Sequence, residues 1–218
     1  MDKAVVKDQP EQWRLLDRRV IHRGHIVTME EHDLVSPSGE KLTREVIRHL
    51  GAVAVIALDD DGRIAVVHQY RHAVCSRLVE PPAGLLDLDG ENPLTAAQRE
   101  LAEEAGLAAS DWRVLADYCT SPGVSDEVAR IYLARDVRPV DRPDGFVARG
   151  EEADMGLDWL PLDDVMTAIR DGRVNNVALV LGVTSLCLAM ADGRVDDLRP
   201  GDAPWTMYQH VVVGKCHE

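Results

Sequence analysis

The stretch from Asn92 to Gly106 is the part of this chain whose local structure the sequence marks most clearly. Asn92 is a favourable helix N-cap, and Pro93 suits the first helical position. Apolar residues recur at helical spacing at Leu94, Ala97, Leu101 and Ala105. Gly106 suits the left-handed residue that ends many helices. The sequence therefore predicts one helix here, with an apolar stripe that faces a core.

Three glutamates, Glu100, Glu103 and Glu104, fall within about one turn of this predicted helix. Side chains three or four residues apart on a helix are neighbours, so these carboxylates repel one another unless a cation lies between them. Mg²⁺ takes oxygen ligands and is held by a few carboxylates together with substrate phosphates. The cluster indicates a metal platform. Taken alone, however, Glu-x-x-Glu-Glu is more typical of an ordinary acidic surface helix.

The sequence around the helix resembles the Nudix hydrolase signature, G-x5-E-x7-R-E-U-x-E-E-x-G-U, in which U is a bulky apolar residue. Residues 99–107 match it at every fixed position, and Glu91 has the required spacing from Arg99. The sequence departs from the signature once, because six residues rather than five separate Gly84 from Glu91. The extra residue falls in the turn at 87–90, where a loop can absorb it.

Further segments are similar to the ADP-ribose pyrophosphatase branch of that superfamily, occur in its order, and look closest to its actinobacterial members. They are residues 69–71, 80–84, 121–127 and 151–155. The likeness covers roughly residues 15–190 and implies an α/β fold: a Nudix α/β/α sandwich with a mixed sheet, plus an N-terminal β-layer for dimerisation. The expected organisation is an N-terminal tail and β-layer at 1–50, a catalytic domain at 51–191 and a C-terminal extension at 192–218.

The net negative charge of the chain argues against nucleic-acid binding and against binding to an anionic membrane surface. The 218 residues are 45% apolar, which is enough for a sizeable core, and the net charge is −14. A nucleic-acid binder normally shows a basic patch, and an acidic chain is also disfavoured at an anionic membrane surface. An acidic enzyme can still take an anionic substrate when a metal ion and a few arginines reverse the local field.

Cysteine usage and hydropathy indicate a cytoplasmic protein. Four widely spaced cysteines form no Cys-x-x-Cys pair, so reduced thiols are expected and zinc binding is not. Residues 1–14 are polar and charged, unlike a signal peptide. The most apolar run, 177–190, is 14 residues long and too short to span a bilayer, but it fits a packed helix.

The remaining elements are predicted from periodicity and turn residues. Alternation over 13–29 predicts one half-exposed strand, which a turn at 36–39 separates from a second strand through Val46 and Ile47. Further strands are expected at 52–58, 64–70, 112–119 and 128–135 and in a short segment ending at Trp159, helices at 162–170 and 176–190, and loops at 59–62 and 136–150. No element is expected in the tail after Asp192.

The resemblance assigns metal binding to the acidic helix. It implies that Glu100, Glu104 and, close behind them, Glu103 bind Mg²⁺, for which Mn²⁺ could substitute, together with the backbone carbonyl of Ala83. It gives Arg99 the role of orienting these glutamates by ion pairing. The alternative for Arg99 is a solvent-exposed arginine on an ordinary helix.

The resemblance places the catalytic base in the loop that ends at Glu151 and Glu152. A carboxylate near metal-bound water can accept the proton of the attacking water. The alignment favours Glu151, but a gap of one residue would transfer the role to Glu152, and two exposed loop acids are the alternative. No Gly-x-Ser-x-Gly elbow or Walker-type Gly-Lys-Ser/Thr occurs, so direct attack by water is the simplest mechanism.

Substrate contacts are expected from Arg71, which follows Gln69 at the end of a strand, because a guanidinium recognises phosphate with two parallel hydrogen bonds. The alternative is a surface arginine at a strand end. Arg48 is a weaker phosphate candidate. Glu127 is a candidate to accept hydrogen bonds from the terminal ribose.

The resemblance implies a Mg²⁺-dependent homodimeric enzyme that hydrolyses the pyrophosphate bond of ADP-ribose to AMP and ribose 5-phosphate. One alternative is the same chemistry on another nucleoside diphosphate sugar. Another is a non-catalytic ADP-ribose-sensing module. Such modules typically lose motif glutamates and are fused to a DNA-binding domain, whereas all three glutamates are present here and no helix-turn-helix region is apparent.

Overall fold

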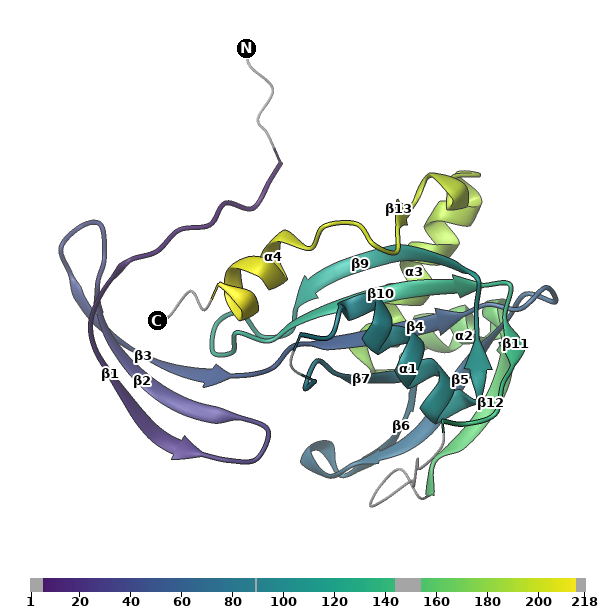
Figure 1. The fold of residues 1–218 in the computed structure, drawn as a ribbon, viewed down its shortest axis with the longest axis horizontal. Coiled ribbons are helices and arrows are strands. Elements are labelled where there is room, and N and C mark those ends of the chain that lie inside the picture. Colours follow the sequence, from purple (N-terminus) through teal and green to yellow (C-terminus); the bar gives the residue numbers. More distant parts are fainter. Residues whose placement is uncertain (1–5, 89, 144–153, 215–218) are drawn as a thin grey trace, which may run out of the picture. The chain divides into compact units, whose positions relative to one another are not determined.

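The computed structural model describes residues 6–88, 90–143 and 154–214, which group into two compact units (Figure 1). The larger unit comprises residues 52–118 and 129–204. The smaller unit comprises residues 1–51, 119–128 and 205–218. Within the described residues, no helix is long and apolar enough to cross a membrane.

The larger unit is built on a mixed five-stranded sheet in the order β13-β9-β10-β4-β7. β10 runs parallel to β4, whereas β7 is antiparallel to β4. The predicted strands at 52–58, 112–119 and 128–135 are confirmed. The strands are β4 (Ala52–Ala57), β7 (Ala83–Leu85), β9 (Asp111–Cys119), β10 (Val128–Arg135) and β13 (Arg199–Pro200).

A second, antiparallel sheet has the order β12-β5-β6 and consists of β12 (Gly156–Pro161), β5 (Arg63–Arg71) and β6 (Ser76–Glu80). Between β4 and β5 the chain turns at Asp59, whose carboxylate accepts hydrogen bonds from the backbone N–H of Asp61 and Arg63 at 3.1 and 2.7 Å. The predicted loop at 59–62 is confirmed, and the Asp59 side chain holds it through these two hydrogen bonds. A short pair, β8 (Leu107–Ala108) with β11 (Arg138–Pro139), completes the strands of this unit.

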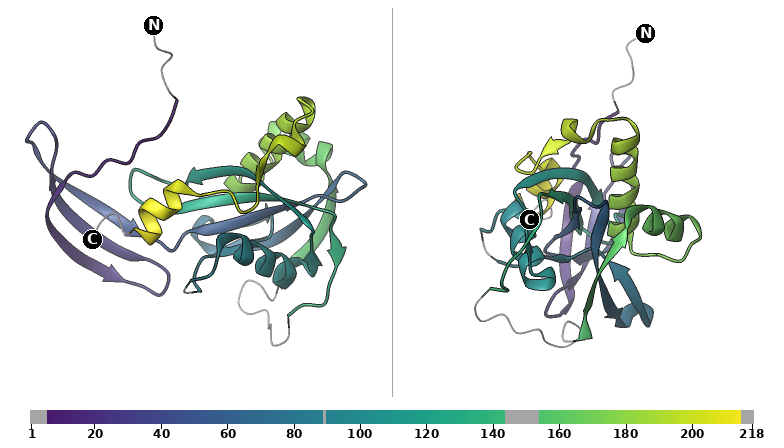
Figure 2. Two further views of the ribbon diagram at one scale, coloured as in Figure 1. Left: turned by 45° about the horizontal axis from the view of Figure 1, so that its top comes forward. Right: turned by 90° about the vertical axis from the view of Figure 1, so that its right-hand side faces the viewer.

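Helices cover both faces of the central sheet (Figures 1 and 2). α1 (Pro93–Ala105) lies on one face, and α2 (Leu162–Arg170) and α3 (Val177–Ala191) lie on the other. α3 packs closely because Gly182 has no side chain, and a Cβ there would come within 2.8 Å of Ile56 Cγ1. The predicted helices and the expected α/β/α arrangement are confirmed.

The tail after Asp192 contains ordered elements, so the expectation of none was wrong. They are the 3₁₀ turn Val195–Asp197 and β13 in the larger unit, and α4 (Thr206–Tyr208) with the π-helical turn Gln209–Val213 in the smaller unit. A distant partner holds the chain directly after β13, where Gly201 N–H donates to the carbonyl of Trp112 at 2.8 Å.

Arg130 on β10 contacts the part of this tail that belongs to the larger unit. The residue is only 2% exposed, and its guanidinium pairs with both oxygens of Asp117 at 2.6 and 3.0 Å. It also donates to the backbone carbonyls of Ala203 at 2.7 Å and Pro204 at 3.2 Å. One buried cation therefore satisfies a carboxylate and two carbonyls at the point where the tail leaves the sheet.

Replacing Arg130 with Met is expected to lower the free energy of unfolding by about 2–4 kcal/mol, because partners of a buried ion pair lose their donor. The urea midpoint of unfolding measures this loss. Arg173→Met is the matched control, since Arg173 pairs with Asp171 at 3.0 Å in an exposed setting, and it should cost less than about 0.5 kcal/mol. Equal midpoints for the two variants would show that the Arg130 cluster does not anchor the tail.

The smaller unit contains an antiparallel three-stranded sheet in the order β1-β2-β3, consisting of β1 (Arg14–Arg23), β2 (Thr28–Val35) and β3 (Lys41–Arg48). The single strand expected over 13–29 was wrong. The chain turns after β1, where Gly24 N–H donates to the Val27 carbonyl at 2.9 Å. The predicted turn at 36–39 is confirmed, because Gly39 N–H donates to the Ser36 carbonyl at 2.9 Å.

Candidate active site

α1 has the boundaries that its sequence predicts. The Asn92 side chain accepts a hydrogen bond from Leu94 N–H at 2.9 Å, and Gly106 ends the helix at a φ of 63°. The apolar stripe is buried, with Ala97 and Leu101 fully inaccessible. Glu100 and Glu104 flank this stripe, so both carboxylates are brought to the boundary between the helix and β7.

Arg99 connects the acids of the motif. Its Nε and Nη2 each donate to a carboxylate oxygen of Glu91 at 3.1 Å. Its Nη1 donates to Glu100 at 2.6 Å and to Glu103 at 3.2 Å. These contacts, above all the hydrogen bonds that Arg99 donates to Glu91, raise the pKa of the Arg99 guanidinium. Arg99 is therefore the cation that lies between the carboxylates of Glu91, Glu100 and Glu103.

The extra residue between Gly84 and Glu91 is absorbed by the turn. Glu91 N–H donates to the Leu88 carbonyl at 3.0 Å, and Gly90 takes a φ of 77°, which favours glycine. The bidentate contact between Glu91 and Arg99 shows that the longer turn still delivers this carboxylate to the helix.

Glu100 is packed against Gly84. A Cβ on Gly84 would lie 2.0 Å from the carboxyl carbon of Glu100, so only glycine leaves room for this side chain. Burial raises the pKa of the Glu100 carboxyl to about 7, against the opposing effect of Arg99, and the charges of Glu103 and Asp87 raise it further. The effect of burial on this carboxyl is thus larger than that of the one cation, Arg99, that contacts it.

Glu104 is 8% exposed, and its Oε2 accepts a hydrogen bond from the backbone N–H of Ala83 at 2.9 Å. This bond links the helix to the first residue of β7. Two of the predicted metal-binding positions, Glu104 and Ala83, are therefore adjacent in space although 21 residues separate them in the chain.

Mg²⁺ needs oxygen ligands, and the carboxylates of α1 and the carbonyl of Ala83 are the predicted donors. Among the described residues, no three His, Cys, Asp or Glu side chains are grouped so that they could hold a metal ion. In this arrangement Arg99 supplies the positive charge to Glu100 and Glu103. The chemistry of the donors nevertheless fits Mg²⁺, because they are all oxygens and include a buried carboxylate with a raised pKa.

Arg71 and Gln69 lie two residues apart on β5 and share one face of the strand. Gln69 is buried, whereas Arg71 is partly exposed and donates to both oxygens of Glu80 at 2.6 to 3.2 Å. Glu80 is 2% exposed. The sequence analysis did not single out Glu80 as a site residue, although its pairing with Arg71 fixes where the guanidinium lies.

Arg48 and Glu127 belong to the smaller unit. Arg48 Nε pairs with Asp126 at 2.7 Å, and the same carboxylate accepts a hydrogen bond from His49 N–H at 2.7 Å. Glu127 accepts a hydrogen bond from Thr120 Oγ1 at 2.7 Å. The structure therefore places both predicted residues at the loop that joins β9 to β10, with Asp126 as a partner that was not predicted.

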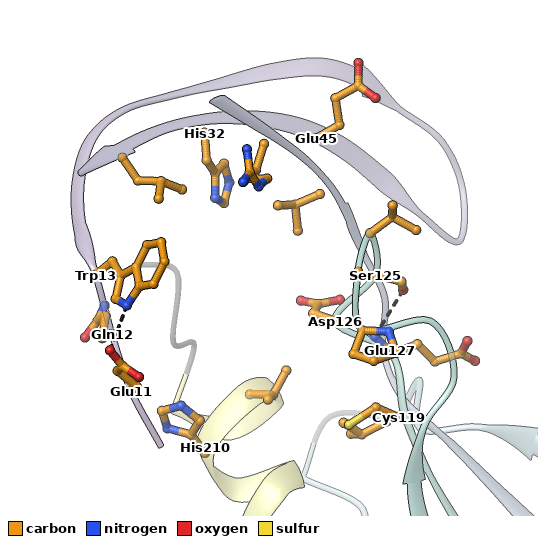
Figure 3. A pocket seen from close by; sticks show the side chains of 18 of the residues that line it. Glu11, Gln12, Trp13, His32, Glu45, Cys119, Ser125, Asp126, Glu127 and His210 are labelled. Atoms are coloured by element: carbon orange, nitrogen blue, oxygen red, sulfur yellow. Dashed lines mark hydrogen bonds between the residues drawn. The ribbon is translucent and has the colours of Figure 1, made fainter. Parts of the chain in front are cut away.

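Glu127 also lines a pocket of about 720 Å³ within the smaller unit (Figure 3). Trp13, His32 and His210 are on its wall, and Cys119 lies near Glu127. Burial is the main cause that raises the pKa of the Cys119 thiol, so this thiol stays protonated near neutral pH and is a poor nucleophile.

Glu151 and Glu152, the predicted alternatives for the base, lie outside the described residues. The chain is described again from Asp154, two residues before β12. The roles of these two acids, of the metal-binding positions and of the substrate contacts therefore stay predictions.

A match to a family model decides the family. A family model described as the NUDIX domain matches residues 48–179, which is more than half of the chain. This chain belongs to the NUDIX family. The match spans the Arg99 to Leu107 motif and confirms the predicted family and the prediction of a hydrolase.

Relatives and a solved structure agree with this membership. The chain is 43% identical over 88% of its length to "ADP-ribose pyrophosphatase" of Mycobacterium tuberculosis strain H37Rv, of which it covers 91%. It is 35% identical over 78% of its length to "Methanol dehydrogenase activator" of Bacillus methanolicus, of which it covers 90%. A crystal structure of an ADP compounds hydrolase matches with a TM-score of 0.70 at 24% identity, over 87% of this chain and 100% of that one. This structural match supports the predicted Nudix fold.

Proposed function

We propose that this Nudix protein hydrolyses the pyrophosphate bond of ADP-ribose, giving AMP and ribose 5-phosphate, in a reaction that depends on Mg²⁺. The observation that carries the proposal is the 43% identity, over 91% of its length, to a protein named ADP-ribose pyrophosphatase. At that identity the chain keeps every fixed residue from Arg99 to Leu107, so the acids that the chemistry needs are present.

Glu100, Glu104 and Glu103 would hold Mg²⁺, together with the carbonyl of Ala83. When bound, the ion polarises the phosphoryl oxygens and lowers the pKa of water. Arg99 keeps Glu100 and Glu103 apart and oriented, as its hydrogen bonds of 2.6 and 3.2 Å indicate. Gly84 leaves the space in which the Glu100 carboxylate lies.

Arg71 is the proposed phosphate contact of the larger unit. Its pairing with buried Glu80 holds the guanidinium in one orientation, and its side chain is 44% exposed. A preoriented guanidinium stabilises charge that develops on phosphate oxygens. Gln69 lies beside Arg71 on the same strand face and is the proposed hydrogen-bonding partner of the same phosphates. Arg48 and Glu127 stay predicted substrate contacts.

Water is the proposed nucleophile, and Glu151 is the proposed base, with Glu152 as the alternative. A carboxylate that accepts the proton of the attacking water leaves the oxygen free to bond to phosphorus as the bridging oxygen departs with the other phosphate. The chain offers no serine or cysteine motif that would need a covalent intermediate.

A panel of nucleoside diphosphate compounds tests the proposal. The purified protein is incubated with ADP-ribose, ADP-glucose, GDP-mannose or NADH, with Mg²⁺ or with EDTA, and the products are separated by ion-exchange chromatography. We expect AMP and ribose 5-phosphate from ADP-ribose with the highest kcat/KM, and no turnover in EDTA. A higher kcat/KM for another sugar nucleotide would replace the substrate and keep the chemistry. No hydrolysis of any of the four would overturn the proposal.

We also propose that the protein is a homodimer that forms through the β-layer of the smaller unit. β1 is exposed along its whole length and carries Leu15, Leu16, Val20 and Ile21 at 38 to 53% exposure. It is an edge strand of a three-stranded sheet. Apolar edge strands of small sheets are normally covered by a partner.

Sedimentation velocity at micromolar concentration is expected to give about twice the 24.1 kDa mass of one chain. Ile21→Glu should shift the protein to the monomer, because a charge on the covered strand would be buried. Leu188→Glu, at a 64% exposed position of α3, is the matched control and should leave the mass unchanged. A wild-type monomer would contradict the prediction.

A further inference from the structure

The loop from Thr120 to Glu127 belongs to the smaller unit and closes on itself. Thr120 N–H donates to the Glu127 carbonyl at 3.2 Å, and the N–H groups of Val124 and Ser125 both donate to the Ser121 carbonyl at 2.9 Å. Glu127 N–H donates to Ser125 Oγ at 3.1 Å (Figure 3). Thr120 and Glu127 therefore form the neck of a short loop that is held by its own hydrogen bonds.

The end of β3 fixes the other side of this loop. Ile47 N–H donates to the Val124 carbonyl at 2.7 Å, and Asp126 N–H donates to the Ile47 carbonyl at 3.1 Å. The Asp126 carboxylate accepts a hydrogen bond from His49 N–H and pairs with Arg48 Nε, both at 2.7 Å. The loop backbone is therefore fixed without help from the two side chains at its neck.

One hydroxyl group holds the Glu127 carboxylate. Thr120 Oγ1 donates to Glu127 Oε2 at 2.7 Å. Nδ1 of His49 lies 3.5 Å from Oε1, but it accepts a hydrogen bond from Gly51 N–H at 3.3 Å and so has no hydrogen to donate. Among the described residues, Thr120 is therefore the one hydrogen-bond donor to this carboxylate, and Oε1 keeps its capacity to accept.

The chemistry of Glu127 limits what Oε1 can bind. An ionised carboxylate only accepts hydrogen bonds, and it repels phosphate groups. A ligand group at this oxygen must therefore be a donor. In ADP-ribose, the donors are the hydroxyl groups of the two riboses and the amine of adenine. The Glu127 side chain is 25% exposed, so its carboxylate is in contact with solvent.

We propose that Thr120 is a positioning residue, which holds the Glu127 carboxylate so that Oε1 can accept a hydrogen bond from a hydroxyl group of the terminal ribose. This role rests on the function proposed above, in which Glu127 contacts the substrate. Immobilising one flexible side chain on binding lowers affinity roughly three- to tenfold. Thr120 reduces that loss, because its hydrogen bond already holds the carboxylate in the free protein.

The first test compares two ligands that cannot be hydrolysed, α,β-methylene-ADP-ribose and α,β-methylene-ADP, of which the second lacks the terminal ribose. Their Kd values are measured by isothermal titration calorimetry with Mg²⁺. We expect Thr120→Val to raise the Kd of α,β-methylene-ADP-ribose roughly three- to tenfold and to leave that of α,β-methylene-ADP unchanged. Thr120→Ser keeps the hydroxyl group and should bind both like the wild type. Equal losses for both ligands, or no loss for either, would overturn the proposal.

Thr43→Val is the matched control, because Thr43 Oγ1 also donates to a carboxylate of the smaller unit, that of Asp33, at 2.6 Å. It should leave both Kd values unchanged. The double variant Thr120→Val with Glu127→Ala should lose no more affinity than Glu127→Ala alone, since the hydroxyl group acts through that carboxylate. A further loss in the double variant would show that Thr120 acts by another route and would overturn the proposal.

Steady-state hydrolysis of ADP-ribose gives a second readout. A contact with the terminal ribose is made in the ground state and in the transition state alike. Thr120→Val should therefore raise KM by the factor found for Kd and leave kcat within about twofold of the wild type. A fall in kcat with unchanged KM would overturn the proposal. So would a loss that follows a lowered urea midpoint of unfolding, because Thr120 would then act through stability.

A third readout needs no ligand. Crystal structures of the wild type and of Thr120→Val should show the same loop backbone, with its hydrogen bonds to Ile47, but a displaced or multiply oriented Glu127 carboxylate in the variant. One unchanged carboxylate position would overturn the proposal. If the wild type hydrolyses no substrate and binds neither analogue, the proposed function fails, and these two structures alone still decide whether Thr120 holds Glu127.

Discussion

Glu104→Gln is expected to lower kcat by about 10³-fold or more while the protein stays folded. Loss of a metal-binding carboxylate removes several kcal/mol of transition-state charge stabilisation, and about 4 kcal/mol corresponds to 10³ in rate. The amide keeps the size of the side chain. Its oxygen can still accept the 2.9 Å hydrogen bond from Ala83 N–H, so the link between α1 and β7 is retained.

The measurement is kcat for ADP-ribose over a Mg²⁺ titration, with the unfolding midpoint recorded for each variant. Glu40→Gln, at an exposed position before β3, is the control for the loss of one carboxylate charge. It should leave both quantities unchanged. Turnover of Glu104→Gln near the wild-type value at saturating Mg²⁺ would rule out Glu104 as an essential ligand.

Helices and strands were predictable where their caps, apolar patterns and turn residues lie close together in the sequence. α1 was placed correctly because its cap, its first-turn proline, its apolar stripe and its terminal glycine all lie within residues 92–106. The buried strand β4 was recognised from one continuous apolar run. The division of the N-terminal segment into β1 and β2 was missed, because Gly24 was the only turn residue between two runs of similar composition.

The parts of the site that depend on long-range pairing were not predictable. Arg71 was singled out, but its partner Glu80 becomes visible only through the pairing of β5 with β6. The tight packing of Gly84 against Glu100 requires α1 to lie on β7. Arg130 looked like any charged residue in an apolar strand, and its role depends on carbonyls more than 70 residues away. No pattern of periodicity or spacing encodes such contacts.

The acidic motif on α1 was partly predictable from local sequence and partly dependent on contacts that only the structure shows. The clustering of Glu100, Glu103 and Glu104 led to the prediction of a metal site, and this assignment stays a prediction. The structure adds that Arg99 supplies positive charge to this cluster in the protein as described, and that it also holds Glu91 despite the longer turn. Because Arg99 pairs with Glu100 and Glu103, Mg²⁺ would have to compete with the guanidinium for these two carboxylates, and we expect Arg99 to influence metal affinity.

The base can be assigned by comparing Glu151→Gln with Glu152→Gln. Both acids lie outside the described residues, so the kinetics must separate them. A base acts on water in the transition state and not on substrate binding. Glu151→Gln should therefore lower kcat by about 10²- to 10⁴-fold with little change in KM. Added Mg²⁺ should not restore the rate, because the missing group accepts a proton and does not bind the ion.

Glu152→Gln serves as the matched variant, since it removes the same charge one residue further along the chain. We expect a milder loss, or one that higher Mg²⁺ reverses. The opposite result, with Glu152→Gln deeper and insensitive to Mg²⁺, would place the base one residue later than the motif alignment does. If neither change costs more than about tenfold, or ~1.4 kcal/mol of barrier, the base lies outside this pair.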